Sequence, residues 1–324
     1  MSAFGFSVGF RGSLGRRLRS MRLKKIYKAI KGSIYIDRYD GDESTTIVLS
    51  GMGRSGTTWV SDVINYDHSY REVYEPFAPA RVKQARCFGA LHYVRPTCSD
   101  EVMMSASEAI LSGKVRNLWV DKSNPSFIGN RRIVKDVQTN LMLGWFHRMR
   151  PQMPIILLTR HPLGVVSSWM KLGWGVVFAG EERVYDEVFK QKDLLEDYPI
   201  IREAMDEVDD SSYFEQFVML WCVLHYVPYQ QFAEGGAFFA NYDELVENPE
   251  GGFAKLFEYL DRPFSWGEIE GVLSRPSKTN YQKREFQGGV GGKGPEWMGV
   301  FDKEGRKRAE KILGIFGLEG RFEL

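Results

Sequence analysis

A glycine-rich turn between a predicted strand and a predicted helix is the most constraining feature of this 324-residue chain. The β-branched and apolar residues of 46–49 predict a buried strand, and Gly51, Gly53 and Gly56 predict a tight turn after it. From Thr57 onward, apolar residues recur on one face and predict a helix. Such a turn directs several backbone N–H groups to one point at the positive end of a helix dipole. It therefore favours the binding of a phosphate or sulfate group.

The turn resembles the first half of the phosphate-binding loop of nucleoside-triphosphate enzymes but departs from it at one position. Gly51 and Gly56 have the spacing of that motif, and Thr58 occupies the position of its Ser or Thr. The lysine that normally reaches the terminal phosphates of ATP or GTP is replaced by Thr57, and a positive charge lies inside the loop at Arg54. We therefore expect the loop to hold a phosphate group without transferring one from a triphosphate.

A second anion-binding element is predicted at the end of the apolar run 154–159. A continuous run of this kind is typical of a strand in a parallel sheet that is covered on both faces. Arg160 follows at the carboxyl end of the strand, where parallel sheets bind ligands, and its planar fork suits a phosphate. Pro162 is expected to begin a helix that carries Ser168 as a hydroxyl donor.

Together, the two elements resemble those of sulfotransferases that use 3′-phosphoadenosine 5′-phosphosulfate (PAPS). The sequence GRSGTTW is similar to the family's loop for the 5′-phosphosulfate, with an arginine that is closer to the carbohydrate-type and bacterial members than to the cytosolic aryl type. The spacing of Arg160 and Ser168 matches the family's 3′-phosphate element. The resemblance implies PAPS as co-substrate, 3′,5′-bisphosphoadenosine (PAP) as product, and no metal. The loop residues that it assigns to the cofactor are Gly53, Arg54, Ser55, Gly56, Thr57, Thr58 and Trp59.

The resemblance also implies three candidates for catalysis. Glu75 precedes Pro76 at the end of an extended segment, like a Glu-Pro element that lines the acceptor site in carbohydrate-type members, and is the preferred candidate for the general base. Residues 119–125 predict the end of an apolar strand followed by a charged turn, and this segment is similar to one that carries a lysine near the transferred group. Lys122 is thus a candidate for stabilising the bridging oxygen, and Lys135, after another short apolar stretch, is the alternative.

A late glycine-rich and basic segment, 278–301, resembles a family loop over the 3′-phosphate. Lys293 and Gly294 are expected to contact the nucleotide, with Trp297 near them, when such a loop closes. Elsewhere, an aromatic stripe with helical spacing begins at Phe214, and Pro228 is expected to bend or end that helix.

The order of these elements predicts an α/β fold. We expect a central, mainly parallel sheet flanked by helices, similar to phosphate-loop enzymes and sulfotransferases, over residues 43–324. Further strands and helices are predicted at 237–241, 138–150, 252–260 and 302–316.

Residues 1–42 are predicted to form a basic appendage. The first 31 residues contain arginine and lysine but no acid, in a pattern that suits an amphipathic helix. This composition leaves four interpretations open. The segment could bind an anionic membrane surface, bind an anionic glycan, act as a transit peptide or form a solvated tail.

Composition narrows the class of protein. A formal net charge of +1 gives no nucleic-acid signature, and five scattered histidines give no metal-ligand spacing. Three cysteines without a close pair favour a reducing compartment. No apolar run is long enough to span a membrane, so we expect a cytoplasmic protein, free or in peripheral contact with a membrane.

The expected activity is transfer of a sulfuryl group from PAPS to a hydroxyl or amine. Arg54 and the Glu75-Pro76 pair favour a glycan or glycolipid as acceptor. Two alternatives remain at this stage. One is a small-molecule kinase with a phosphate-binding loop, and the other is a non-catalytic protein that binds a nucleotide or a glycan.

Overall fold

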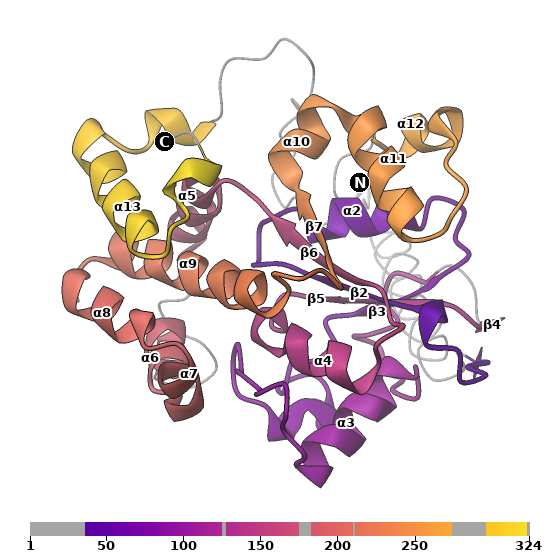
Figure 1. Cartoon of the computed structure of the whole chain (residues 1–324). Helices are drawn as coiled ribbons and strands as arrows, with labels where there is room; N and C mark the ends of the chain where they lie inside the picture. Colours follow the sequence, from indigo (N-terminus) through magenta and orange to yellow (C-terminus); the bar gives the residue numbers. More distant parts are fainter. Residues whose placement is uncertain (1–35, 125–127, 175–182, 210, 274–295, 323–324) are drawn as a thin grey trace, which may run out of the picture.

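The computed structural model describes residues 36–124, 128–174, 183–209, 211–273 and 296–322 (Figure 1). The strands are β1 (Ile36–Asp37), β2 (Thr46–Ser50), β3 (Arg71–Tyr74), β4 (Ile128–Gly129), β5 (Arg132–Asp136), β6 (Ile155–Thr159) and β7 (Phe238–Asn241). The α-helices are α2 (Thr57–Ile64), α3 (Glu101–Leu111), α4 (Leu143–Met149), α5 (Pro162–Leu172), α6 (Val184–Phe189), α7 (Lys192–Asp197), α8 (Ile200–Glu207), α9 (Tyr213–Gln231), α10 (Tyr242–Glu247), α11 (Pro249–Tyr259), α12 (Trp266–Leu273) and α13 (Lys303–Ile315).

Five parallel strands form the central sheet in the order β3-β5-β2-β6-β7. The last residue of β2, Ser50, lies opposite Asp136 of β5 and Leu157 of β6. Because all neighbours run in the same direction, the loops that follow the strands emerge along one edge, where ligands bind in sheets of this kind. The loop after β2 lies at the middle of that edge. The predicted α/β fold with a parallel sheet is confirmed.

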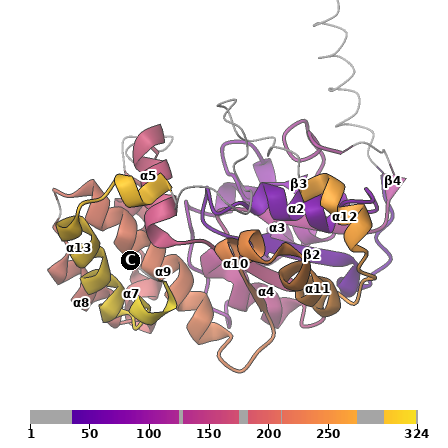
Figure 2. The ribbon, with the colours of Figure 1, turned by 90° about the horizontal axis from the view of Figure 1, so that it is seen from above.

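Helices cover both faces of the sheet, as Figure 1 shows. Ile47 and Leu49 of β2 pack in one apolar cluster with α2, α11 and α12, whereas Val48 packs on the opposite face in a cluster with α3 and α4. A third cluster centres on α9, and the view in Figure 2 shows α5, α9 and α13 beside the sheet rather than over it. Within the described segments, no helix combines the length and apolar content that crossing a bilayer requires.

Most of the predicted elements are present, but Pro228 does not end its helix. α9 continues to Gln231, three residues beyond the proline. A proline inside a helix lacks the N–H that would bond the carbonyl four residues earlier. Here the carbonyl of Leu224 instead accepts a hydrogen bond of 3.1 Å from the Asn140 side-chain amide.

Asn140 belongs to a short 3-10 turn that precedes α4, so the predicted helix 138–150 is a 3-10 turn followed by a shorter α-helix.

The prediction that the segment 119–125 opens with the end of a strand is wrong, because residues 118–123 form a series of turns. The side-chain oxygen of Asn117 accepts hydrogen bonds from the N–H groups of Trp119 and Val120, at 2.8 Å and 2.9 Å. The apolar side chain of Val120 is fully buried. The Val120 carbonyl accepts a hydrogen bond of 2.9 Å from the Tyr74 N–H at the edge of the sheet. The apolar residues that indicated a strand thus pack a turn against the edge strand.

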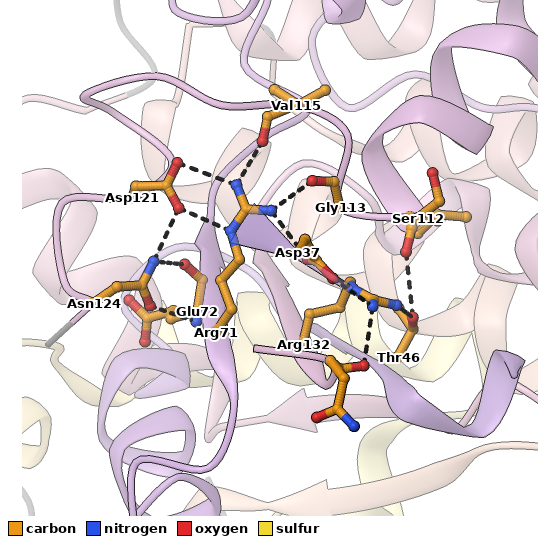
Figure 3. A network of polar contacts seen from close by, with 12 residues as sticks. Asp37, Thr46, Arg71, Glu72, Ser112, Gly113, Val115, Asp121, Asn124 and Arg132 are labelled. Atoms are coloured by element: carbon orange, nitrogen blue, oxygen red, sulfur yellow. Dashed lines mark hydrogen bonds and ion pairs between the residues drawn. The ribbon is translucent and has the colours of Figure 1, made fainter. Parts of the chain in front are cut away.

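A network of buried charges lies at the amino ends of β3 and β5 (Figure 3). Asp37 forms ion pairs with Arg71, at 3.1 Å, and with Arg132, at 2.8 Å. Arg71 also pairs with Asp121, at 2.8 Å, so that two acids balance two arginines whose side chains are fully buried. Asp37 precedes the domain start expected at residue 43, yet it contacts the first residues of two sheet strands.

Replacement of Asp37 should destabilise the fold strongly. In Asp37→Ala, the Arg132 guanidinium would remain buried without a carboxylate, and removal of one partner of a buried ion pair costs about 3–5 kcal/mol. Urea unfolding of the purified chain measures the change in the free energy of unfolding. Glu207→Ala, which removes an exposed ion pair with Lys311, is the control and should leave the unfolding midpoint nearly unchanged. Equal midpoints for the two variants would contradict a structural role for the network.

Candidate functional site

The loop between β2 and α2 has a backbone that tolerates only glycine at two positions. A Cβ atom on Gly51 would lie 2.7 Å from the Leu158 carbonyl oxygen. Gly56 has φ +96° and a Cβ there would lie 2.5 Å from the Tyr242 ring. Gly56 is also the residue before α2, and it has no side chain to cap the first N–H groups of the helix. The uncapped N–H groups and the positive end of the helix dipole form a site for an anion.

The two predicted anion-binding elements meet in space. Arg54 Nε donates a hydrogen bond of 3.0 Å to the Ser168 hydroxyl oxygen. Arg160 Nη1 donates one of 3.0 Å to the backbone carbonyl of Arg54. Arg54 itself has φ 76°, an uncommon left-handed conformation for a residue with a side chain, and strain of this kind clusters at functional sites. The arrangement concentrates two guanidinium groups beside the amino end of α2.

Two buried donors in this cluster lack a hydrogen-bond partner among the described residues. They are the Ser55 hydroxyl and Nε of Arg160. A buried donor without an acceptor costs about 1–3 kcal/mol, and native structures contain few of them. Both atoms belong to the predicted elements, and an anion with several oxygens would supply the acceptors. The donor set therefore fits a phosphate or sulfate ester.

Residues that the sequence interpretation did not assign to the site hold the glycine loop and Arg160 in place. Trp169 Nε1 donates a hydrogen bond of 2.7 Å to the carbonyl of Gly53. The guanidinium carbon of Arg160 lies 4.7 Å from the centroid of the Tyr242 ring, a cation–π contact. Tyr242 follows the end of β7 and Trp169 follows Ser168. In the sequence, the signal for Tyr242 was its position after a strand, and the signal for Trp169 was its position after a predicted binding residue.

The turn after Arg160 is held from two directions. The N–H of His161 donates a hydrogen bond of 2.7 Å to the Asp243 carboxylate. The His161 ring stacks on Trp297, with centroids 3.9 Å apart. The late segment that the sequence placed over the 3′-phosphate therefore contacts the Arg160 element through Trp297. Lys293 and Gly294, the two residues predicted to bind the nucleotide, lie outside the described residues.

Glu75 and Lys135 form an ion pair next to the first turn of α2. Their closest atoms are 3.0 Å apart, and Lys135 Nζ lies 3.5 Å from the Thr58 hydroxyl oxygen. The side chain of Lys135 is 1% exposed and that of Glu75 is 18% exposed, so the carboxylate is the more accessible group of the pair. Glu75 has φ 41°, and its backbone is fixed by hydrogen bonds to the Lys135 carbonyl and from the Trp119 indole, at 2.7 Å and 3.0 Å.

Asp136, the residue after Lys135, fixes the turn that follows Glu75. Its carboxylate accepts hydrogen bonds from the N–H groups of Phe77, at 2.7 Å, and Gln138, at 2.8 Å. Complete burial raises the pKa of the Asp136 carboxyl to about 7, although these hydrogen bonds oppose the rise. No role was predicted for Asp136 from the sequence. The sequence feature that could have indicated one is a charged residue at the end of a buried strand.

Lys122 lies beside the same aromatic ring as Lys135. Its Nζ is 3.1 Å from the centroid of the Tyr74 ring, which Lys135 also approaches at 4.0 Å. Part of the Lys122 side chain is exposed. Partial burial nevertheless lowers the pKa of its ammonium to about 8; the charge of Glu75 opposes this change and the charge of Lys135 adds to it.

The structure thus brings most of the predicted site residues together. Arg54, Arg160 and Ser168 form one cluster, and Thr58 connects the loop to Lys135 and Glu75. Trp59 is placed differently, because its ring lies edge-on to Tyr242 and Phe253 in the core beside α2. Among the described residues, no group of three or more His, Cys, Asp or Glu side chains is arranged to hold a metal ion.

Comparison with known proteins identifies the family. The sulfotransferase domain model matches residues 44–291, most of the chain. This chain belongs to the sulfotransferase family. The family predicted from the glycine loop and the Arg160 element is therefore confirmed.

Individual relatives of this sulfotransferase are distant. The nodulation protein NoeE of Sinorhizobium fredii (strain NBRC 101917 / NGR234) is 26% identical over 140 residues, which are 41% of this chain and 32% of the relative. The aligned part is thus about a third of that relative. Among solved structures, the sulfotransferase STF9 from Mycobacterium avium has a TM-score of 0.43 at 13% identity, over 86% of this chain and 79% of that one. The mouse sulfotransferase SULT7A1 complexed with PAP has a TM-score of 0.41 at 14% identity, over 89% and 92%.

The lowered pKa of Lys122 predicts unusual reactivity in this sulfotransferase. An amine is acylated only in its neutral form, so Lys122 should react at a lower pH than an ordinary lysine, with half of its maximal rate near pH 8. Short pulses of an acylating reagent between about pH 6 and about pH 11, followed by peptide mass spectrometry, measure this rate. Exposed Lys114 provides an internal reference on the same chain. A Lys122 profile that follows ordinary lysine, with a midpoint near pH 10.5, would contradict the environment described above.

Proposed function

We propose that this sulfotransferase transfers the sulfuryl group of PAPS to a hydroxyl group of a glycan or glycolipid. The observation that carries the proposal is the meeting of two sites at one helix end. The anion-binding cluster of Arg54, Arg160 and Ser168 lies beside the amino end of α2, and Thr58 of the same helix lies next to the Glu75–Lys135 pair. A donor held by the first site would present its transferable group to the second.

In this proposal, PAPS is bound through its two charged ends. The backbone N–H groups at the start of α2 and the Ser55 and Thr57 hydroxyls hold the 5′-phosphosulfate. Arg160 and Ser168 hold the 3′-phosphate, where a planar guanidinium binds two oxygens at once. Arg54, whose Nε lies 3.0 Å from the Ser168 hydroxyl, would connect the two ends. The buried donors of Ser55 and Arg160 would then gain acceptors.

Glu75 is the proposed general base. Its carboxylate takes the proton of the acceptor hydroxyl while the hydroxyl oxygen attacks sulfur and the bond from sulfur to the bridging oxygen of the 5′-phosphate breaks. The sulfate ester and PAP are the products, and the proton remains on Glu75. Lys135 is better placed than Lys122 to stabilise the negative charge on the leaving phosphate, since its Nζ lies 3.5 Å from Thr58 at the start of α2. Protonation of Glu75 would weaken its 3.0 Å ion pair and leave Lys135 free to bind that charge.

Nucleotide binding tests the donor. PAP at about 100 times its Kd should stabilise the protein by about 2.7 kcal/mol and raise its melting temperature, whereas ADP, which lacks a 3′-phosphate, should have little effect. Arg160→Gln should reduce the shift with PAP, because Nε of Arg160, a buried donor without a partner among the described residues, is proposed to face the 3′-phosphate. Arg148→Gln, at an exposed arginine of α4, is the control. Stabilisation by ADP and not by PAP would favour a kinase instead.

Substitution of the base separates chemistry from binding. Glu75→Gln should lower kcat for sulfation of a glycan acceptor by about 10²–10⁴-fold, since an amide cannot take the proton, and should leave PAP affinity close to that of the parent protein. Radiolabelled PAPS with a panel of glycans measures transfer, and the thermal shift with PAP measures binding. Glu101→Gln, at an exposed position in the first turn of α3, is the matched control. Unchanged kcat in Glu75→Gln would exclude Glu75 as the base.

A further inference from the structure

A column of alternating cations and aromatic rings leads away from Glu75 toward the surface. Lys122 Nζ lies 3.1 Å from the centroid of the Tyr74 ring and 4.4 Å from that of Trp119. The guanidinium carbon of Arg81 lies 5.1 Å from the Trp119 centroid. The two rings are in edge contact, at 5.2 Å between centroids. The Trp119 indole also donates a hydrogen bond of 3.0 Å to the Glu75 carbonyl, which attaches the column to the proposed base.

The carboxylates near this column are bound elsewhere. Glu75 pairs with Lys135, at 3.0 Å, and Asp121 pairs with Arg71, at 2.8 Å. Glu72 accepts a hydrogen bond of 2.8 Å from the Ser61 hydroxyl. Within the part of the chain that the structure describes, neither Arg81 nor Lys122 forms an ion pair, and both are exposed. Arg81 and Lys122, which both contact Trp119, are therefore available to an anion from solution.

Hydrogen bonds anchor Asp121 and Asn124, on either side of Lys122 in the sequence (Figure 3). Asn124 pairs with the backbone of the edge strand: its oxygen accepts from the Glu72 N–H, at 2.7 Å, and its amide donates to the Glu72 carbonyl, at 3.0 Å. Asp121, on the other side of Lys122, is held by two hydrogen bonds from buried Arg71. A cation on a fixed support loses little conformational entropy when it binds an anion, which favours a binding role.

We infer that Arg81 and Lys122 bind an anionic group of the acceptor, a carboxylate or a sulfate, next to the hydroxyl that is sulfated. This inference rests on the proposed function. It assigns the two lysines to different substrates: Lys135, near Thr58, serves the donor, and Lys122, near Trp119, serves the acceptor. The acceptor class is then an acidic saccharide rather than a neutral one.

A matched pair of acceptors tests the inference. One probe is an unsulfated chondroitin hexasaccharide, and the other is the same hexasaccharide with its carboxylates reduced to alcohols. We expect kcat/KM to be about tenfold higher for the acidic probe at low ionic strength, and the difference to shrink at about 0.3 M salt. Arg81→Gln should remove most of this preference and change kcat/KM for the neutral probe by less than about twofold. Arg86→Gln, at an exposed arginine in the short 3-10 segment that follows Arg81, should keep the preference.

Acylation of Lys122 gives a readout that does not depend on turnover. In the presence of PAP, the acidic hexasaccharide should slow acylation of Lys122 at pH 8, because a bound anion favours the charged ammonium, and the reduced hexasaccharide should not. Equal protection by both probes, or protection by neither, would overturn the inference. Transfer to both probes with equal kcat/KM would also overturn it while leaving the proposed function intact. Protection by the acidic probe, together with no transfer to any glycan of the panel, would support the binding site and contradict the proposed function.

Discussion

The parallel register of β5, β2 and β6 is the constraint on which the site depends. Ser50, at the end of β2, lies level with Asp136 and with Leu157, so the loops after three neighbouring strands leave the sheet within one or two residues of the same level. The glycine loop, Lys135 and Arg160 thereby reach one edge although they are far apart in sequence. A shift of β5 by one residue would turn Lys135 to the opposite face of the sheet and remove it from Thr58.

The opposite edge of the sheet contains the buried charges that maintain this register. Arg71 and Arg132 are the first residues of β3 and β5 and lie opposite one another, and Asp37 binds both. Charges of this kind are stable only when each has a well-placed partner, so an alternative pairing of the strands would leave at least one guanidinium unsatisfied. Through Asp121, the same network reaches the turn that carries Lys122. The amino edge of the sheet therefore supports the position of a side chain near the carboxyl edge.

The parts of the site that are local in sequence could be predicted, and those that depend on contacts between distant segments could not. The glycine loop and the Arg160–Ser168 element each combine a buried strand, a turn and a helix within a few residues. Their residue types, their spacing and the resemblance to a family therefore indicated them from the sequence. Trp119 and Val120 are apolar like the end of a strand, but they lie in a turn, and buried Val120 packs against the edge of the sheet. Pro228 remains helical because Asn140, far away in sequence, donates a hydrogen bond to the buried Leu224 carbonyl, which lacks its usual partner in the helix. Neither fact is contained in a local pattern.

Charge balance connects the proposed base to both lysines. Lys122 and Lys135 approach the same Tyr74 ring, at 3.1 Å and 4.0 Å. The charge of Glu75, and to a smaller extent that of Glu72, opposes the lowering of the Lys122 pKa to which Lys135 contributes. In the proposed reaction, Glu75 becomes neutral at the moment when the leaving phosphate becomes more negative. The positive charges of both ammonium groups are then less well balanced by negative charge nearby. Anions from the two substrates can restore it, the leaving phosphate for Lys135 and an acidic group of the acceptor for Lys122. An acceptor without such a group would leave Lys122 with less negative charge near it, and the lowered pKa of this lysine would allow it to lose its proton instead.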